Sequence, residues 1–459
     1  MCPGASVRNH KPSLAYLKCI VKTVEGKALD YLEIEGGSPL CGEVRIQGSK
    51  NAVLPILSAA LLYPGVTVLE NCPGISDVAS MLEILKGYGC TTLREGNKLI
   101  IDAGNLHSGR APEDYAGVMR SSIMLLGSLL GRLGEAFLPY PGGCVIGKRP
   151  IDLHLKALRE MGAQLQEEPE GIRAVCAHPK GARIRLPFPS VGATENVILL
   201  AVRAEGTTVL ENAAREPEIT ELCRFLCSMG ARIRGAGTGT VMVTGVQRLH
   251  ETEFTIMPDR IVAGTYMLLT AAAGGKVILR DVPLWQLASV RKTLAGMGVR
   301  LEGKDLKETK KGEGKLDEKA SDVLLFSPGR IRGGLQISTA PYPGFPTDLQ
   351  SPLMAALCTA EGESVVEERI FEARFKTAEE LIRMGADICI QGSRACIRGT
   401  GRLHGERVEA RELRGGAALC IAAAAAEGKT TIHQYHYIAR GYENIIRDLK
   451  ALGVVVNYG

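Results

Sequence analysis

The segment AEGTTVLENAAREPEITELCRFLCSMGARI, residues 204–233, contains the pattern from which the architecture of the whole chain can be inferred. After Gly206 comes a short β-branched run from Thr207 to Leu210, followed by a polar turn and then by apolar residues at helical spacing. This order predicts a strand, a turn and a helix. The helical pattern stops at Gly230, and a glycine at that place is typical of a left-handed C-terminal cap.

The same pattern recurs about six times along the chain, which indicates a repeat architecture. The other copies start at Tyr63, Pro141, Ala273, Ala360 and Ala426. Each leading glycine is preceded by a helical segment that is small and apolar on nearly every face, as fully buried helices are. These segments span residues 52–62, 122–133, 196–204, 261–273, 349–360 and 416–427. Each unit is therefore predicted to contain a buried helix, a strand, a second helix that faces water on its charged side, and one or more further strands.

Three such units can bury their helices together, so we predict an α/β fold of two domains, each with three units, in which helices lie inside and sheets outside. The length of 459 residues agrees, because it is about three times that of a ~150-residue domain. One segment has no place in the repeats. Residues 303–322 are highly charged and have no apolar period, which predicts a solvated surface insertion.

Composition excludes several classes of protein. Lysine and arginine total 55 and aspartate and glutamate 50, and the net charge of +5 is too small for a protein that coats nucleic acid. No run of 18 uncharged apolar residues is present, so we expect no membrane span. Residues 1–30 form a basic extension, in which Lys18 and Lys22 interrupt the only candidate core of a secretory signal. The 13 cysteines, an odd number without a C-x-x-C pair, predict reduced, mostly buried thiols in a cytoplasmic protein.

Basic residues stand at the start of four of the six buried helices, at Lys50, Arg120, Arg260 and Arg414. A helix N-terminus carries roughly half a positive charge, so a cation there is disfavoured by about 0.3–1 kcal/mol unless an anion binds beside it. We therefore predict a cleft between the domains in which Lys50, Arg120, Arg414 and free helix amide groups collect an anionic ligand. The alternative for each cation is an ion pair with a local carboxylate, and recurrence in several units weakens that alternative.

Two further segments have residue types suited to chemistry. Cys144 lies in the loop PGGC, just before Lys148 and Arg149, and cations near an exposed thiol favour its thiolate. Asp348 follows three prolines in TAPYPGFPTDLQ, residues 339–350, where it could act as a general base on a hydroxyl group. The alternatives are a buried apolar role for Cys144 and a helix N-cap for Asp348, and spacing alone favours the cap.

These segments resemble the enolpyruvyl transferases, and among them the enzymes that act on UDP-N-acetylglucosamine. The resemblance covers about residues 31–459, and its most specific segments are GSKNAVLPIL, MRSSI, PGGCVIGKRPIDLH, SVGAT, AAREPEI, PYPGFPTDLQ, EARF, ELRGGAAL and RGYE. The family fold is an inside-out α/β barrel of six repeats in two domains. The resemblance implies a first domain at 50–257 and a second at 31–49 and 258–459, preceded by the extension 1–30.

The resemblance also implies a reaction. The enolpyruvyl group of phosphoenolpyruvate is moved to the 3′-hydroxyl of UDP-N-acetylglucosamine and phosphate is released, which is the first committed step of peptidoglycan synthesis. Neither a metal nor an organic cofactor is implied. We expect these small molecules as partners, no nucleic acid or membrane, and either a monomer or a weak homo-oligomer.

The resemblance assigns roles to individual residues. Lys50, Arg149 and Arg414 surround phosphoenolpyruvate, whose phosphate and carboxylate suit fixed cations. Cys144 corresponds to the loop cysteine that donates a proton to the methylene carbon, can form a covalent adduct and is the target of the epoxide antibiotic fosfomycin. Asp348 corresponds to the carboxylate that binds, and can deprotonate, the 3′-hydroxyl. The residues implied to contact the nucleotide sugar or to lie near the site are Asn51, Arg120, Arg149, Pro150, Ile151, Asp152, Leu153, Ser190, Val191, Gly192, Ile370 and Arg374.

Two other functions are alternatives on sequence grounds. An enzyme that uses the same donor with shikimate 3-phosphate would have the same fold, but its pattern lacks the PGGC loop, so Cys144 argues against it. A non-catalytic scaffold that binds anionic metabolites is disfavoured by the joint presence of Lys50, Cys144, Asp348 and Arg414. The sequence leaves open whether Cys144 acts mainly as an acid or as a covalent nucleophile.

Overall fold

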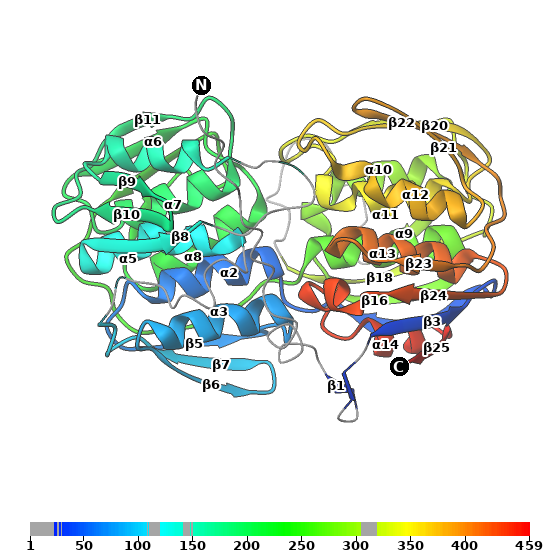
Figure 1. Cartoon of the computed structure of the whole chain (residues 1–459), viewed down its shortest axis with the longest axis horizontal. Helices are drawn as coiled ribbons and strands as arrows, with labels where there is room; N and C mark the ends of the chain where they lie inside the picture. The colour runs from blue at the N-terminus through cyan, green and yellow to red at the C-terminus, as the bar shows by residue number, and fades with distance from the viewer. Residues whose placement is uncertain are drawn as a thin grey trace, which may run out of the picture.

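The computed structural model describes residues 23–24, 27–28, 30–107, 109, 120–140, 147, 150–303 and 319–459. Cys144 and Arg149 lie outside the described residues, as does the side chain of Arg120. Most of the extension 1–30 and of the insertion 303–322 lie outside them as well. Figure 1 shows that the described chain forms two lobes side by side, with helices inside each lobe and sheets at its periphery.

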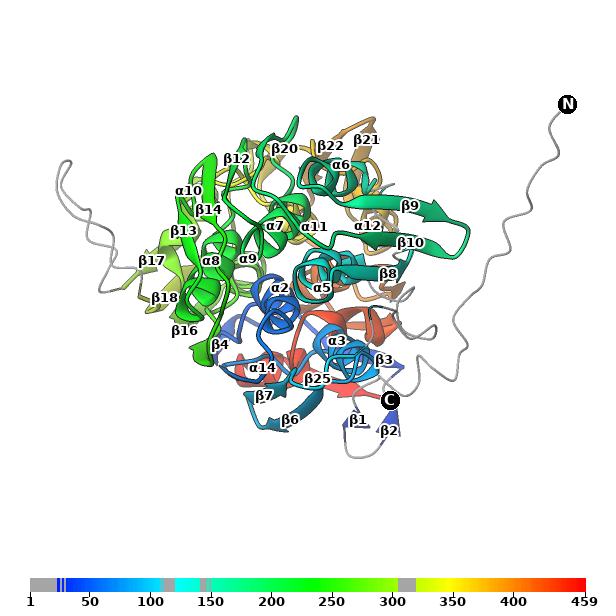
Figure 2. The same ribbon diagram turned by 90° about the vertical axis from the view of Figure 1, so that its left-hand side faces the viewer.

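The first lobe contains three of the sheets that the structure describes. Its strands are β5 (Val66–Glu70), β6 (Thr91–Glu95), β7 (Lys98–Asp102), β8 (Glu135–Pro139), β9 (Gln164–Glu168), β10 (Gly171–Val175), β11 (Arg183–Arg185), β12 (Thr207–Glu211), β13 (Arg232–Arg234), β14 (Thr240–Thr244) and β15 (Thr252–Thr255). They are arranged in the orders β15-β5-β7-β6, β8-β10-β9 and β11-β12-β14-β13. Its helices are α2 (Lys50–Ala60), α3 (Ser76–Gly87), η1 (Arg120–Met124), α5 (Leu125–Leu133), α6 (Asp152–Glu160), α7 (Val191–Ala201) and α8 (Pro217–Ser228). Seen end-on, these helices occupy the middle of the lobe and the sheets lie around them (Figure 2).

The second lobe is built in the same way. Its strands are β3 (Tyr31–Glu35), β4 (Leu40–Arg45), β16 (Gly275–Val282), β17 (Arg300–Glu302), β18 (Ser321–Ser327), β19 (Gln336–Ser338), β20 (Gly362–Glu367), β21 (Asp387–Gln391), β22 (Arg394–Gly399), β23 (Arg407–Glu409), β24 (Lys429–His433) and β25 (Val455–Tyr458). They are arranged in the orders β17-β18-β16-β4, β19-β20-β22-β21 and β23-β24-β3-β25. Its helices are α9 (Arg260–Ala273), η2 (Leu284–Gln286), α10 (Ala288–Gly296), η4 (Thr347–Leu349), α11 (Gln350–Leu357), η5 (Arg374–Lys376), α12 (Thr377–Arg383), α13 (Leu413–Ala425), η6 (Tyr435–Arg440) and α14 (Ile445–Ala451). A short hairpin of β1 (Thr23–Val24) and β2 (Lys27–Ala28) precedes the lobe.

The four-stranded sheets share one topology, which confirms the predicted repeat. In the sheet of residues 183–244, β12 pairs in parallel with the edge strand β11 and antiparallel with β14, which pairs antiparallel with β13. The last sheet has the same pattern, although β3 comes from the start of the chain and lies between β24 and β25. The N-terminal strand therefore completes the final repeat. The six described sheets of the two lobes stay separate, and no continuous closed barrel forms among the described strands.

Each lobe has its own hydrophobic core. One core is formed by buried side chains between residues 52 and 256, and the other by residues 32–46 together with residues 261–456. The helices predicted to be apolar on all sides are at the centre of these cores. In α9, for example, every residue from Arg260 to Ala272 is buried. Among the described residues, no helix combines the length and the apolar character that crossing a membrane requires.

Two buried helices start earlier than predicted, because side chains cap them. Helix α7 begins at Val191 instead of residue 196, since Ser190 Oγ accepts a hydrogen bond from the Ala193 N–H at 3.3 Å. Helix α13 begins at Leu413 instead of residue 416, since the Glu412 carboxylate accepts from N–H groups of its first turn. The added first turns contain Val191 and Gly192 in α7 and Arg414 in α13, which are among the expected site residues.

The chain crosses between the lobes twice, at two segments that lie side by side. The first leads from β4 to α2 and the second from β15 to α9. The Ser49 N–H donates to the Met257 carbonyl at 2.8 Å, and the Asp259 N–H donates to the Gln47 carbonyl at 2.9 Å. The two crossings therefore form one short hydrogen-bonded connection between the lobes.

Candidate active site

Lys50 is the first residue of α2, directly after the first crossing. Its ammonium nitrogen lies 2.7 Å from Oδ2 of Asp77, which is in the first turn of α3. The same carboxylate accepts a hydrogen bond from Arg440 Nε at 2.9 Å, and Arg440 ends η6 in the other lobe. Asp77 therefore links a cation of the first lobe to a cation of the second.

Burial changes the proton affinity of this pair. The Lys50 side chain is 11% exposed and the Asp77 side chain 8% exposed. Burial lowers the pKa of Lys50, and the positive charges of Arg440 and Arg414 lower it further. The negative charge of Asp77 raises it, but the net shift is downward. Burial alone would raise the pKa of Asp77, but Lys50 and Arg440 lower it to about 2. The Asp77 carboxylate is therefore ionised at neutral pH.

A second carboxylate, that of Asp348, lies between two buried arginines. Arg374 donates to its Oδ1 at 2.6 Å and Arg414 donates to its Oδ2 at 3.0 Å. Asn51, which follows Lys50 in the other lobe, donates to the same Oδ2 at 3.4 Å. The two arginine side chains are 2% and 3% exposed, whereas that of Asp348 is 27% exposed. The carboxylate is thus held by buried cations and remains accessible to a ligand.

The N-cap alternative for Asp348 is wrong. Pro346 occupies the N-cap position of η4, and Asp348 lies inside the first turn of that helix. Its side chain instead pairs with the arginines, which come from α13 and η5. Burial alone would raise the pKa of Asp348, but Arg414, Arg374 and Lys50 hold it well below the usual range.

Arg414 is fixed from several sides. Its guanidinium carbon lies 5.8 Å from the centre of the Tyr442 ring, and its Nη1 lies 3.5 Å from the Tyr442 hydroxyl. That hydroxyl is in turn 2.8 Å from Thr265 Oγ1. A cation held in this way can stabilise developing negative charge without first having to reorganise.

Within the described residues, the cluster joins cations and carboxylates in similar number, because the buried Asp259 also lies close enough to Arg414 to raise its pKa. The cations are Lys50, Arg374, Arg414 and Arg440, and the carboxylates are Asp77, Asp348 and Glu412. Lys50 and Arg414 thus do have carboxylate partners, as the alternative interpretation proposed. The partners are distant in sequence, however, and they converge on one place. The arrangement is an ionic cluster in which four cations from both lobes lie close together.

Helix amide groups contribute less than predicted. Asp259 Oδ2 accepts from the Lys50 N–H at 3.0 Å, while Oδ1 accepts from the N–H groups of Ile261 at 2.7 Å and Val262 at 3.1 Å. A carboxylate therefore occupies amide groups at the starts of α2 and α9. The prediction of free amides at these two helix ends is wrong, because Asp259 lies at the crossing and reaches both. Positive charge at the site comes chiefly from side chains.

Several residues expected to contact the nucleotide sugar lie at the starts of two neighbouring helices. Pro150 and Ile151 precede α6, Asp152 and Leu153 begin it, Ser190 caps α7, and Val191 and Gly192 begin that helix. A Cβ atom at Gly192 would lie 2.7 Å from Cε1 of His154 in α6. A side chain at position 192 would have to displace the His154 ring or move the two helix starts apart.

Ile370 is held next to the segment that carries Asp348. The buried Glu368 carboxylate accepts from the Ile370 N–H at 2.8 Å through Oε1. Its Oε2 accepts from the Thr347 hydroxyl at 2.9 Å, and Thr347 directly precedes Asp348. One carboxylate therefore fixes both segments relative to each other.

Gly147 is the described residue closest in sequence to Cys144 and lies two residues before Arg149. A Cβ atom at Gly147 would collide with the carboxylate of Glu372, two residues before Arg374. The chain at Gly147, which belongs to the first half of the sequence, thus lies against the second lobe beside the cluster.

Sequence reasoning missed three members of the cluster, namely Asp77, Glu412 and Arg440. Arg440 lies in the RGYE segment, but nothing in that segment indicates a partner in the other lobe. Asp77 stands at the start of a predicted helix, where an acidic residue has an ordinary structural explanation. Only the three-dimensional contacts show that these residues belong to the site.

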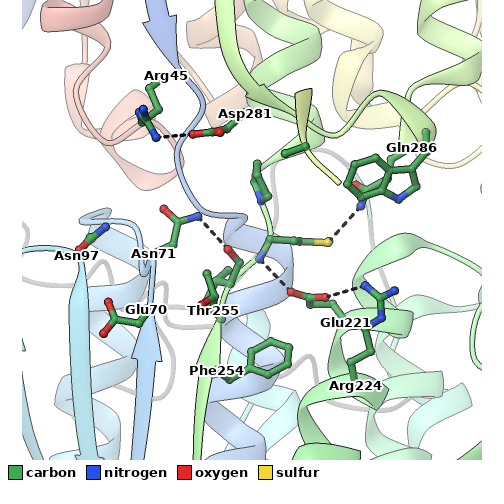
Figure 3. Close-up of a pocket in the computed structure, with 15 residues that line it drawn as sticks. Arg45, Glu70, Asn71, Asn97, Glu221, Arg224, Phe254, Thr255, Asp281 and Gln286 are labelled. Carbon is green, nitrogen blue, oxygen red and sulfur yellow. Dashed lines mark hydrogen bonds and ion pairs between the residues drawn. The ribbon is translucent and has the colours of Figure 1, made fainter. Parts of the chain in front are cut away.

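An open cavity of about 660 Å³ lies beside the crossing and is lined by residues of both lobes (Figure 3). The expected site residues that the structure describes do not line it. Here the Met257 N–H donates to Glu221 Oε1 at 2.9 Å, and Gln286 Nε2 lies 3.3 Å from Met257 Sδ. Burial raises the pKa of Glu221 to about 7. These contacts support the connection between the lobes and are separate from the cationic cluster.

Comparisons with known proteins agree with this geometry. The family model described as EPSP synthase (3-phosphoshikimate 1-carboxyvinyltransferase) matches residues 34–449. The UDP-N-acetylglucosamine 1-carboxyvinyltransferase 2 of Caldanaerobacter subterraneus subsp. tengcongensis is 45% identical over 422 residues, which are 92% of this chain and 97% of the relative. The UDP-N-acetylglucosamine 1-carboxyvinyltransferase of Nitratidesulfovibrio vulgaris strain Hildenborough is 45% identical over 425 residues, 93% of this chain and 98% of the relative.

Solved structures show the same architecture. The enolpyruvyl transferase NikO from Streptomyces tendae is 25% identical and matches with a TM-score of 0.81 over 94% of this chain and 99% of that chain. EPSP synthase from Acinetobacter baumannii, 20% identical, shares the fold with a TM-score of 0.68 over 94% of this chain and all (100%) of that chain. The chain therefore belongs to the EPSP synthase family of enolpyruvyl transferases, and within it to the UDP-N-acetylglucosamine 1-carboxyvinyltransferases.

Proposed function

We propose that this chain transfers the enolpyruvyl group of phosphoenolpyruvate to the 3′-hydroxyl of UDP-N-acetylglucosamine and releases phosphate. Relatives at 45% identity bear the name of this activity. The structural observation that supports it most is the position of Asp348 between Arg374 and Arg414, with Asn51 of the other lobe beside it. A carboxylate that can bind a hydroxyl group thereby lies within a cluster of cations that can bind an anionic donor.

The donor requires positive charge, since phosphoenolpyruvate carries a phosphate and a carboxylate. We assign its binding to Lys50, Arg414 and Arg149, of which Arg149 lies outside the described residues. Guanidinium groups suit both acidic groups because they donate two parallel hydrogen bonds. Charge that develops on the donor during addition is stabilised by cations already held in place.

Asp348 receives the proton of the 3′-hydroxyl in this proposal. In the free protein its low pKa makes it a weak base, because Arg414 and Arg374 stabilise its ionised form. An anionic donor bound nearby competes for those arginines and raises the proton affinity of the carboxylate. Asp348 therefore becomes an effective base only when both substrates are present.

The reaction consists of an addition and an elimination. In the addition, the 3′-oxygen bonds to C2 of the donor, Asp348 takes the hydroxyl proton, and the methylene carbon gains a proton from Cys144. In the elimination, the former methylene carbon returns its proton to the Cys144 thiolate, the C2–O bond to phosphate breaks as the double bond is restored, and phosphate leaves with the proton held by Asp348. Cys144 lies outside the described residues, and its role here rests on the family resemblance.

The nucleotide sugar is assigned to the neighbouring starts of α6 and α7. The residues are Arg120, Arg149, Pro150, Ile151, Asp152, Leu153, Ser190, Val191 and Gly192, completed by Asn51 and Ile370 from the two sides of the cluster. The first-turn N–H groups of a helix favour a negatively charged group such as a diphosphate. Support for this assignment comes from the close approach of Gly192 to His154, which brings the two helix starts together.

We further propose that the two cores correspond to two domains, residues 50–257 and residues 31–49 with 258–459. The double crossing at Gln47–Asp259 and Ser49–Met257 would then act as the hinge between them. The proposed cellular setting is the cytoplasm, where the chain works as a monomer or a weak homo-oligomer in cell-wall synthesis, and so in cell shape and division.

Phosphate release tests the proposal directly. Purified chain is given phosphoenolpyruvate with either UDP-N-acetylglucosamine or shikimate 3-phosphate, and phosphate is measured over time. We expect turnover with the first acceptor and none with the second. The reverse result would establish the shikimate enzyme, and no turnover with either would support the non-catalytic scaffold.

Fosfomycin tests the role of Cys144. Intact-protein mass spectrometry should show one covalent adduct on the native chain in the presence of UDP-N-acetylglucosamine, and none on Cys144→Ser. Cys227→Ser is the matched control, because Cys227 is exposed and lies on α8 away from the cluster. An adduct that survives in Cys144→Ser but disappears in Cys227→Ser would contradict the assignment.

A further inference from the structure

Cys389 and Cys396 face each other across two strands of an outer sheet. In the antiparallel pair β21–β22, Cys389 is the register partner of Cys396. Their neighbours Ile388 and Ile397 point into the core, whereas Cys389 is exposed and Cys396 is half-buried. Residues directly opposite in such a pair share one face, with Cβ atoms about 4.5–5.5 Å apart. Two thiols are therefore neighbours on the solvent side of the sheet.

The geometry of the hairpin is compatible with a bond between these thiols. Gln391 and Arg394 pair at the turn, so Cys389 and Cys396 are the second pair beyond them and belong to the same hydrogen-bonded class. Such pairs have Cα atoms about 5.5 Å apart, inside the roughly 4.4–6.8 Å range spanned by disulfides. In this class the Cβ atoms lie toward the wide end of the roughly 4.5–5.5 Å range, so they must approach by about 1 Å or more to reach the roughly 3.5–4.5 Å of a disulfide. Strand β21 is at the edge of its sheet, so it can move without breaking a second ladder.

We propose that Cys389 and Cys396 form a redox-active dithiol that closes reversibly to a cross-strand disulfide when the protein meets a low-molecular-weight disulfide. The proposal is independent of the transferase activity. The Cys389 thiolate attacks one sulfur of the oxidant, the oxidant's S–S bond breaks, and one thiolate leaves. The Cys396 thiolate then attacks Cys389 Sγ and expels the second thiolate. Two protein thiols are oxidised, one disulfide is reduced to two thiols, and the two protein protons pass to the departing thiolates.

The product should be easy to reduce again. The bond lies on an exposed face and requires the hairpin to tighten, and exposed or strained disulfides have the more oxidising potentials. Thiols at moderate concentration should therefore reopen it. This property distinguishes a reversible modification site from a structural cross-link.

The other exposed cysteines in the described part of the chain have different surroundings. Cys41 is opposite Lys276 in its sheet. Cys227 lies one helical turn after Cys223, but Cys223 is buried and burial raises its pKa to about 12, so it supplies little thiolate. Both exposed thiols should stop at a mixed disulfide with the oxidant.

Trypsin makes the test direct, because Arg394 lies between the two cysteines. Cleavage at Arg383, Arg394 and Arg398 places Cys389 in peptide 384–394 and Cys396 in peptide 395–398. The reduced full chain is treated with oxidised glutathione, free thiols are alkylated, and the peptides are analysed by mass spectrometry. We expect the two separate alkylated peptides to be lost and one linked pair to appear, lighter by two hydrogens than the sum of the free peptides. Dithiothreitol should restore the separate peptides.

Single variants separate the two steps. Cys389→Ser and Cys396→Ser should each lose the linked peptide and keep one glutathione on the remaining cysteine, while Cys227→Ser should link as the native chain does. The rate of linkage should not depend on protein concentration, because the second step is intramolecular. Glutathione found singly on both peptides of the native chain would overturn the proposal. A covalent dimer through Cys389 as the main product would overturn it as well.

Discussion

Asp77 of the first lobe lies 2.9 Å from Arg440 of the second, and this contact joins the lobes at the candidate site. The other oxygen of the same carboxylate lies 2.7 Å from the ammonium group of Lys50. Lys50 is the proposed donor-binding cation at the start of α2. One buried carboxylate therefore controls both the position of that cation and the approach of the two lobes, so donor binding and closure should respond to the same substitution.

Asp77→Asn should weaken both functions of this residue. The substitution keeps the shape of the side chain but leaves Lys50 without a counter-charge in a buried place. Breaking a buried ion pair by removing one partner costs about 3–5 kcal/mol. Because asparagine keeps a polar amide in place of the carboxylate, we expect the free energy of unfolding to fall by about 3 kcal/mol. We expect a lower denaturation midpoint and a raised KM for phosphoenolpyruvate. Chemical unfolding and steady-state kinetics measure the two effects.

A matched control for Asp77→Asn is available on the same helix. Lys86 and Glu83 form an ion pair at 2.8 Å, but their side chains are 48% and 43% exposed. Exposed pairs contribute about 0–1 kcal/mol, so Lys86→Ala should change stability little and kinetics not at all. Equal effects of the two substitutions would show that the buried Asp77 pair contributes no more than an exposed one.

The pH dependence of stability provides a second test of Asp77. Its pKa is about 2 in the folded chain, below the value of about 3.9 expected when unfolded. A depressed carboxyl pKa contributes stability that is present above the unfolded value and is lost as pH falls toward the folded one. The native chain should therefore lose about 2–3 kcal/mol more than Asp77→Asn between pH 5 and pH 2. If the free energies of unfolding of the two proteins fell equally between pH 5 and pH 2, the low pKa of Asp77 would be contradicted.

Asp348→Asn should remove the base, and because it neutralises the partner of two buried arginines it should also lower the free energy of unfolding. Asparagine can still accept from Arg374 or Arg414, but it cannot take a proton from the sugar hydroxyl. We expect kcat to fall by about 10²–10⁴-fold, the usual range for loss of a general base. Isothermal titration with UDP-N-acetylglucosamine should show that acceptor binding is retained. A near-native kcat in this variant would show that Asp348 binds the acceptor but does not act as a general base.

Much of the fold could be predicted from the sequence because the repeat signal is local. Helices such as α9 are apolar on all sides, so their burial follows from composition alone, and the glycine that ends each second helix marks the next strand. The role of β3 could not be predicted in this way. It pairs with β24 and β25, which lie at the far end of the chain, and pairing over such a separation has no local signal.

The candidate site was predictable to the extent that each residue stood in a recognisable segment. The structure brings Lys50, Asn51, Asp348, Arg374 and Arg414 into one cluster, while the assignments of Cys144 and Arg149 stay predictions.

The amide groups at the starts of α2 and α9 were misjudged because Asp259 bonds across a crossing that the sequence does not show. Asp77 and Arg440 were missed because their contact is made only when the lobes meet.

Gly192→Ala should affect acceptor binding more than donor binding. A Cβ atom there would lie 2.7 Å from Cε1 of the buried His154, so either this ring, whose Nδ1 lies 2.8 Å from Asn196 Nδ2, or the starts of α6 and α7 would have to shift. Overpacking of this kind costs about 1–3 kcal/mol. We expect a raised KM for UDP-N-acetylglucosamine with a smaller change for phosphoenolpyruvate. Gly239→Ala is the control, because a Cβ atom at Gly239 meets no atom within 4 Å.

Glu221→Gln should stabilise the chain at alkaline pH. The Glu221 side chain is 5% exposed, and burial raises its pKa to about 7, above the unfolded value of about 4.3. Between these values the folded chain keeps a proton that the unfolded chain has lost, so stability falls as pH rises through this window, by about 4 kcal/mol in total. Glutamine has no proton to lose and keeps a carbonyl oxygen to accept from the Met257 N–H. The melting temperature of Glu221→Gln should thus be close to that of the native chain at pH 5 and above it at pH 8. Glu251→Gln, at an exposed position, should follow the native chain at both pH values, and the same behaviour in Glu221→Gln would show that Glu221 ionises freely beside the crossing.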